Sequence, residues 1–185
     1  LDNLRKWLRV FEIRGMVEVW YDGMIEAGTF VDAAIKENLQ AADVILLLVS
    51  ADYLASDRIM GSQIKIALER QQRGVATVVP IIVRHCAWKF VKILDDLQVL
   101  PENQEPVLSQ DWQSKEAAWD NVTRGLGLVL KEKGFSGKTL SPVEPEPIAK
   151  WLLPPVPRIM VLGVQEDRPS LNMLTKHFMV LRRAD

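Results

Sequence analysis

The residues of this chain that could act as a nucleophile, an acid or a base are few and scattered. The single cysteine, Cys86, follows His85, and a neighbouring histidine can help to generate a thiolate nucleophile. The sequence identifies no third group that would orient the histidine, and a lone cysteine is more often simply buried. Asp95-Asp96 and the pair Glu144 and Glu146 are interpreted as solvated charges rather than as a metal site or an acid–base pair.

Two further motifs contain residue types that contact nucleotides. Trp20-Tyr21-Asp22 offers rings for stacking, but aromatic residues at strand positions usually pack in the core. Gly125 and Gly127 fall inside a predicted helix with no strand at the right distance before them, so they do not form a phosphate-binding loop. Two histidines and one cysteine provide no credible zinc ligand set, and we expect no metal site and no cofactor.

The composition is that of an ordinary globular protein. The chain has 185 residues, a hydrophobic fraction of 48% and a formal net charge of −1. This charge balance gives no electrostatic footprint for nucleic acid or an anionic membrane, so neither is expected as a partner. A single cysteine excludes an internal disulfide framework and favours a reducing compartment, the cytoplasm. Residues 1–11 have the pattern of an amphipathic helix and not of a signal peptide.

The strongest structural signal is the apolar run between Asp43 and Ser50. It shows no alternation, which is typical of an interior strand of a parallel sheet that helices cover on both faces. Further strands are predicted at 16–21, 76–83, 106–109 and 158–164, and helices at 1–12, about 31–39, 57–72, 90–97, 114–133 and 169–183. Ser114 is a predicted N-cap and Gly15 a predicted helix stop. The alternation of helices and strands predicts a doubly wound α/β fold.

The region after the last long helix changes character. Six prolines punctuate it, at positions 142, 145, 147, 154, 155 and 157, and such a density favours an extended linker. We therefore divide the chain into an α/β domain at 1–133, a proline-rich linker at 134–157, and a strand–helix remnant of unknown membership at 158–185.

Several runs in the first 133 residues together resemble a TIR domain, the Toll/interleukin-1 receptor and resistance-protein module, in its bacterial form. The order and spacing of the runs make the resemblance specific. The runs include Glu18-Val19-Trp20-Tyr21-Asp22, Asp52-Tyr53-Leu54-Ala55-Ser56-Asp57, Ala67-Leu68-Glu69-Arg70, Val79-Pro80-Ile81-Ile82-Val83-Arg84, Cys86-Ala87-Trp88 and Glu116-Ala117-Ala118-Trp119, together with Gly28 and the strand at 42–50.

The resemblance implies a flavodoxin-like sheet of five parallel strands in the order 2-1-3-4-5. The family's central first strand is absent here, since the chain begins inside the helix that should follow it. Three explanations remain open: an N-terminal truncation, which we favour; the strand at 158–164 filling the vacant position; or that strand starting another domain. The predicted helix at 169–183 argues against the second explanation. If strand 158–164 filled the vacant position, this helix would pack where helix 1–12 already lies.

The first activity that the resemblance implies is signalling through contacts with other TIR domains, homotypic or heterotypic. The loop after the family's second strand often makes these contacts, and it corresponds here to residues 22–28, namely Asp22, Gly23, Met24, Ile25, Glu26, Ala27 and Gly28. Met24 and Ile25 are expected to be exposed, which suits a binding loop. The alternative is a plain strand-to-helix connection whose glycines permit the turns.

The second implied activity is cleavage of NAD at the bond between nicotinamide and ribose, in bacterial defence or innate immune signalling. In the family a glutamate on the third helix stabilises the positive charge that develops on the ribose. The matching position here is Ser62 or Gln63, and neither can be negatively charged. Glu69 lies ~9 Å further along the helix and on another face. We therefore expect no catalytic residue, and NAD would be a substrate only if this expectation fails. Gln63 is either a degenerate catalytic position or an ordinary surface glutamine.

Overall fold

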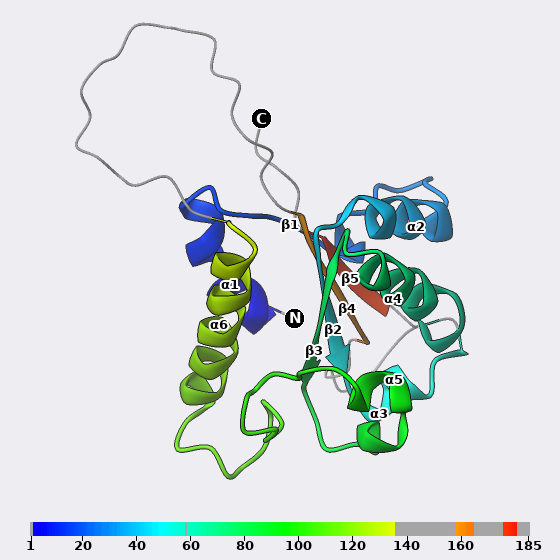
Figure 1. The fold of residues 1–185 in the computed structure, drawn as a ribbon. Coiled ribbons are helices and arrows are strands. Elements are labelled where there is room, and N and C mark those ends of the chain that lie inside the picture. The colour runs from blue at the N-terminus through cyan, green and yellow to red at the C-terminus, as the bar shows by residue number, and fades with distance from the viewer. Residues whose placement is uncertain (1, 58, 136–157, 165–175, 181–185) are drawn as a thin grey trace, which may run out of the picture.

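The computed structural model describes residues 2–57, 59–135, 158–164 and 176–180 as a five-stranded sheet with helices on both faces (Figure 1). The strands are β1 (Glu18–Trp20), β2 (Val44–Val49), β3 (Thr77–Ile82), β4 (Arg158–Val164) and β5 (Lys176–Val180). The helices are α1 (Asp2–Ile13), α2 (Val31–Ala41), α3 (Ala51–Leu54), α4 (Ile64–Gln72), α5 (Lys92–Asp95) and α6 (Lys115–Glu132). The predicted α/β fold class is confirmed.

Strand β2 lies inside the sheet, as its continuous apolar sequence predicts. All six of its residues are buried, and it runs parallel to β3 on one side and to β4 on the other. Its side chains alternate between two separate hydrophobic clusters, with Leu46 in the first and Leu47 in the second. A strand that contributes to both clusters holds the two helical layers of the domain together.

The two helical layers lie on opposite faces of the sheet (Figure 1). Helices α1 and α6 pack together on one face, through buried residues that include Leu4, Leu8 and Trp119. Helices α2, α4 and α5 cover the other face, with Ile35 and Ala67 in its cluster. Ser114 caps α6 as predicted, because its hydroxyl oxygen accepts a hydrogen bond of 3.1 Å from the amide of Ala117.

Strand β4 occupies the position beside β2 that the sequence left vacant. Residues 158–160 pair in parallel with β1, and residues 159–163 pair in parallel with β2. Ile159, Met160 and Val161 are fully buried. A strand of the same chain therefore fills the vacant position, and the expected gap next to β2 is not observed. The segment 158–164 is an integral strand of the domain.

The helix predicted at 169–183 is wrong for residues 176–180, which form β5. This strand runs antiparallel to β4, from Val164 opposite Lys176 to Met160 opposite Val180. A short apolar run suits a strand as well as a helix, so its partner decides the outcome. As a strand it extends the sheet and does not compete with α1. The remainder of the predicted helix and linker residues 136–157 lie outside the described residues.

Three shorter elements also differ from their predictions. The single helix at 57–72 is split, with a π-helical turn at Ile59–Gln63 before α4. The helix at 90–97 is a 3-10 turn at Trp88–Phe90 followed by α5. Residues 106–109 form a turn and not an edge strand, although the amides of Val107 and Leu108 still donate hydrogen bonds to the end of β3. Pro80 lies in β3, which forms one edge of the described sheet.

Candidate functional site

The segment that leaves the carboxyl end of β2 folds back into the protein. The hydroxyl of Ser50 accepts a hydrogen bond of 3.2 Å from the amide of Tyr53 and so caps α3. Tyr53 is 0% exposed, and its hydroxyl makes no hydrogen bond within the described part of the chain. Because burial penalises the phenolate, it raises the pKa of Tyr53 far above its ordinary value. The ring is therefore a neutral core group.

Ser62 and Gln63, the predicted counterparts of the family's catalytic glutamate, lie in different environments. Both lie in the π-helical turn, where Ser62 is exposed and Gln63 is only 4% exposed. The interpretation of Gln63 as an ordinary surface glutamine is therefore wrong. Its amide oxygen has no hydrogen-bond partner among the described residues, and its side chain carries no charge. The nearest acidic alternative on α4, Glu69, is exposed to solvent.

The predicted interaction loop, residues 22–28, follows β1 and begins with a 3-10 turn at Asp22–Met24. Gly23 lies so close to Tyr21 that an added Cβ would be 2.6 Å from the ring, and Gly28 has a φ of +91°, so both positions favour glycine. Met24 is 50% exposed as expected. Ile25 is half-buried against the second cluster, which corrects the expectation that it is exposed.

Exposed apolar residues continue past the predicted loop. Phe30 is 84% exposed, and Val31, at the start of α2, is also exposed. We name Met24, Phe30 and Val31 together the apolar loop surface. The predicted interaction loop ends at Gly28 and therefore leaves out Phe30. A phenylalanine directly before a helix start is a signal that could have extended it.

A polar groove lies beside the interaction loop, between α1 and β1. We call it the α1 groove; it has a volume of about 420 Å³ and is lined by Arg5, Lys6, Arg9, Glu12, Val19, Tyr21 and Met24. The guanidinium of Arg5 is 4.5 Å from the centre of the Tyr21 ring, within cation–π range. Arg9 forms an ion pair of 3.4 Å with Glu12. The Tyr21 ring thus contacts the Arg5 guanidinium and packs against the first hydrophobic cluster. These contacts do not support stacking of the ring on a nucleotide.

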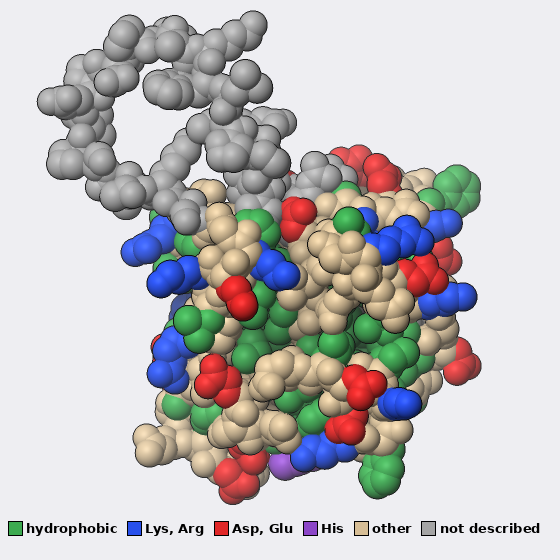
Figure 2. Space-filling view, in the orientation of Figure 1, with side chains coloured by type: hydrophobic (Ala, Val, Ile, Leu, Met, Phe, Trp, Pro, Cys, Tyr) green, Lys and Arg blue, Asp and Glu red, His purple; other side chains and the backbone are tan. Residues whose placement is uncertain are grey.

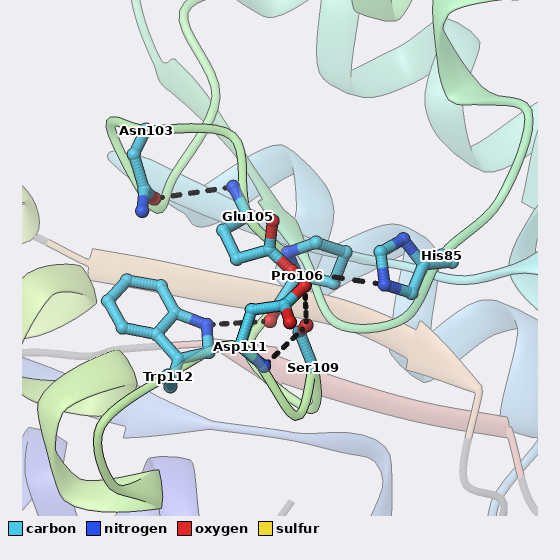
Figure 3. Close-up of polar contacts among 7 residues, drawn as sticks. All are labelled: His85, Asn103, Glu105, Pro106, Ser109, Asp111 and Trp112. Atoms are coloured by element: carbon cyan, nitrogen blue, oxygen red, sulfur yellow. Dashed lines mark hydrogen bonds and ion pairs between the residues drawn. The ribbon is translucent and has the colours of Figure 1, made fainter.

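The other candidate residues are not arranged for catalysis. Figure 3 shows His85 pointing toward Glu105, with 3.8 Å between the imidazole Nε2 and the carboxylate Oε1. Burial raises the pKa of Cys86, which is opposite to the change that a thiolate nucleophile needs. In the loop that contains Glu105, between α5 and α6, Trp112 donates a hydrogen bond of 2.8 Å from Nε1 to the carbonyl of Pro106. These contacts indicate a loop fixed by local interactions.

Neither the paired aspartates nor the helix glycines show features of a ligand site. Asp95 and Asp96 are exposed at the end of α5, and no group of three or more metal-ligating side chains comes together among the described residues. An added Cβ at Gly125 would be 2.4 Å from a methyl of Leu100. Gly125 therefore permits close packing of α6 against Leu100, and it lies inside a helix as predicted.

The sheet and the helices on its two faces define a flavodoxin-like α/β domain. The TIR domain family matches residues 4–120, and the chain belongs to this family. It is 34% identical over 125 residues to "Uncharacterized protein y4lF" of Sinorhizobium fredii (strain NBRC 101917 / NGR234), covering 68% of this chain and 38% of that protein. No solved structure matches significantly. Within the described residues, no helix is long and apolar enough to cross a bilayer.

Proposed function

We propose that this TIR domain is a cytoplasmic signalling module that assembles with other TIR domains, in bacterial defence or immune signalling, and does not cleave NAD. The observation that carries the proposal is the apolar loop surface. Three exposed apolar side chains lie close together in sequence, with Met24 in the predicted interaction loop and Phe30 and Val31 directly after it. Exposed apolar residues of this kind often belong to protein interfaces.

The family's catalytic position supports the second half of the proposal. NAD cleavage requires negative charge close to the ribose as the nicotinamide leaves. Gln63 offers a neutral amide that is buried, and Ser62 offers an exposed hydroxyl. Neither group can supply the charge, and Glu69 points to solvent from further along α4.

Self-association tests the assembly function directly. Sedimentation velocity over a series of concentrations should show oligomers of the wild-type chain, and Met24→Asp should shift them to monomer. Leu128→Asp is the matched control, because Leu128 is 61% exposed on α6, away from the loop. A wild-type chain that stays monomeric at every concentration would contradict homotypic assembly, and so would equal effects of the two variants.

Incubation with NAD tests the absence of catalysis. The wild-type chain should release no free nicotinamide, measured by chromatography over hours at high protein concentration. Turnover that survives Glu69→Ala but is abolished by Gln63→Ala would show that the turn at Ile59–Gln63 is catalytic. The chain would then be an NAD glycohydrolase, and the proposed function would be wrong.

A further inference from the structure

We propose that the α1 groove binds a small organic phosphate, namely a phosphate monoester that carries an uncharged body. The inference goes beyond the proposed function and holds whether or not copies of the chain assemble. It starts from a local excess of positive charge. The whole chain has a formal net charge of −1, but three cations and a single anion line the groove.

The cations of the groove are neighbours on α1. Arg5, Lys6 and Arg9 are all exposed, and Arg5 and Arg9 are four residues apart, a spacing at which like charges repel each other and destabilise a helix. Because Glu12 is the one anion of the lining, the groove keeps a formal charge of +2. Figure 2 shows several Lys and Arg side chains on the side of the molecule formed by α1 and α6. A bound dianion would remove the repulsion.

Contacts inside the groove hold the two guanidinium groups in place. Arg5 lies 4.5 Å from the centre of the Tyr21 ring, and Arg9 forms its ion pair of 3.4 Å with Glu12. Stacking uses the face of a guanidinium, whereas its N–H donors lie in its plane and match phosphate oxygens in pairs. Lys6 adds an ammonium group, and donors that are ordered before binding lose less entropy when the ligand arrives. The donor set therefore favours a phosphate, with three terminal oxygens, over a carboxylate.

The rest of the groove offers an apolar surface beside the cations. Val19 is 8% exposed at its floor, and Met24 is 50% exposed at its rim. The volume of about 420 Å³ lies in the range of small-molecule sites, roughly 300–1,000 Å³. A phosphate group alone leaves most of this space empty. The remaining space suits an uncharged body that packs against Val19 and Met24.

The groove is separate from the predicted catalytic position. Val19 and Tyr21 belong to the hydrophobic cluster under α1 and α6 or pack against it. Gln63 directly precedes α4, which covers the opposite face of the sheet. A ligand in the α1 groove would therefore not contact Ser62 or Gln63, and its binding requires no cleavage of NAD.

Calorimetric titration with phenyl phosphate tests the site. The wild-type chain should bind phenyl phosphate at neutral pH, and it should bind phenyl sulfate, which has a similar shape but a single negative charge, about tenfold more weakly. Arg5→Gln with Arg9→Gln should lower the affinity for phenyl phosphate about tenfold or more, because each lost charge-assisted hydrogen bond corresponds to about a factor of ten. Glu12→Gln should raise the affinity, since it removes the anion of the groove and releases Arg9.

The control variant is Lys36→Gln with Lys65→Gln, which removes the same charge from exposed positions of α2 and α4. It should bind phenyl phosphate like the wild-type chain, and all variants should retain the wild-type circular dichroism spectrum. Equal losses of affinity in the two double variants would overturn the site, because the net charge of the chain would then account for binding. A wild-type chain that does not bind phenyl phosphate would overturn it as well.

Co-sedimentation with vesicles distinguishes the two sources of a phosphate monoester. If the ligand is a lipid headgroup, phosphatidylcholine vesicles that contain a phosphatidylinositol phosphate should pellet the wild-type chain but not Arg5→Gln with Arg9→Gln. If the ligand is a soluble metabolite, phenyl phosphate should bind and these vesicles should not. Vesicles with phosphatidylserine, which has no phosphate monoester, should pellet neither chain. Equal pelleting by both kinds of anionic vesicle would show a general attraction to negative charge and would overturn the phosphate site.

Discussion

The segments that follow β1 and β2 differ in almost every respect, although both leave the carboxyl ends of strands in one sheet. After β2, Tyr53 and Gln63 turn inward and are almost fully buried. After β1, Met24 and Phe30 face solvent. In the family one of these segments carries catalysis and the other carries contacts. Here the segment that matches the catalytic one is part of the core, and the predicted contact loop and the residues directly after it expose apolar side chains.

The position of each strand accounts for the difference. Strand β2 is paired along its length by β3 and β4, so the chain that leaves it enters a densely packed environment. Strand β1 has only three residues, and its pairing with β4 ends at Trp20. The chain that leaves β1 is therefore free to turn outward through Gly23 and Gly28. Under the proposed function, stability and partner contacts thus depend on separate segments, and substitutions can test that separation.

The largest effect is expected from Tyr53→Ala. Removing a fully buried aromatic ring leaves a cavity in the second hydrophobic cluster and should cost about 3–5 kcal/mol of unfolding free energy. Urea denaturation measures the loss. Phe30→Ala is the matched comparison, since Phe30 is exposed, and it should change stability by no more than ~0.5 kcal/mol. Similar losses for the two variants would remove the contrast between the segments.

The next largest effect on stability is expected from Gln63→Glu, and this effect should depend on pH. A buried carboxyl without a partner has a raised pKa in the folded state. The variant should therefore match the wild type below the unfolded pKa of about 4.3 and lose stability as the pH rises above it. The loss should reach about 1–3 kcal/mol at pH 7. Denaturation at pH 4 and pH 7 measures it.

Ser62→Glu is the control for this prediction. It introduces the same carboxyl one residue earlier, at an exposed position, so its effect should stay within ~0.5 kcal/mol at either pH. A Gln63→Glu chain as stable as Ser62→Glu would show that position 63 is open to solvent. Such a chain would also be the natural variant to assay for nicotinamide release.

Alkaline pH should destabilise the protein through Tyr53. Burial raises the pKa of this hydroxyl above its ordinary value of 10.0. Its contribution is therefore fully present below pH 10 and is lost as the pH rises further, by up to ~1.4 kcal/mol per pH unit. Tyr53→Phe should abolish that slope. At neutral pH it should cost under ~1 kcal/mol, because the hydroxyl has no described hydrogen-bond partner. A large loss of stability at neutral pH would show that the Tyr53 hydroxyl has a hydrogen-bond partner.

The smallest effect on stability belongs to Met24→Ser. Met24 is half-exposed in the loop, so its replacement should shift the unfolding midpoint by less than the equivalent of ~0.5 kcal/mol. The same substitution should weaken self-association, which light scattering measures. A destabilised Met24→Ser chain would mean that the loop contributes to the fold, and the separation of roles would fail on that side.

The sequence was sufficient for elements whose own residues determine their structure. The continuous apolar run at 44–49 can be stable only with both faces covered, and it forms the central strand. The hydroxyl of Ser114 is suited to cap the helix that follows, and it does so. The family-typical spacing of the interaction loop likewise placed it directly after β1.

Features that depend on distant partners were not predictable. The apolar run at 158–164 indicates a buried strand, but its sequence does not predict that β1 and β2 are the neighbouring strands. Residues 176–180 suit either a helix or a strand until β4 provides a hydrogen-bonding edge. The periodicity at 57–72 predicts one regular helix, but residues 59–63 form a π-helical turn, in which Gln63 is buried. The α1 groove needs β1 beside α1, which no local pattern encodes.

The placement of β4 has a consequence for the newborn chain. One flank of β2 is covered by residues that are synthesised much later, and at about 5–20 residues per second Ile159 follows Val44 on the order of ten seconds later. Until then an apolar strand presents unpaired amides and carbonyls to its surroundings. Pairing over so long a sequence separation is also slow. Production in the cell should therefore depend on a chaperone that protects β2 until β4 has left the ribosome.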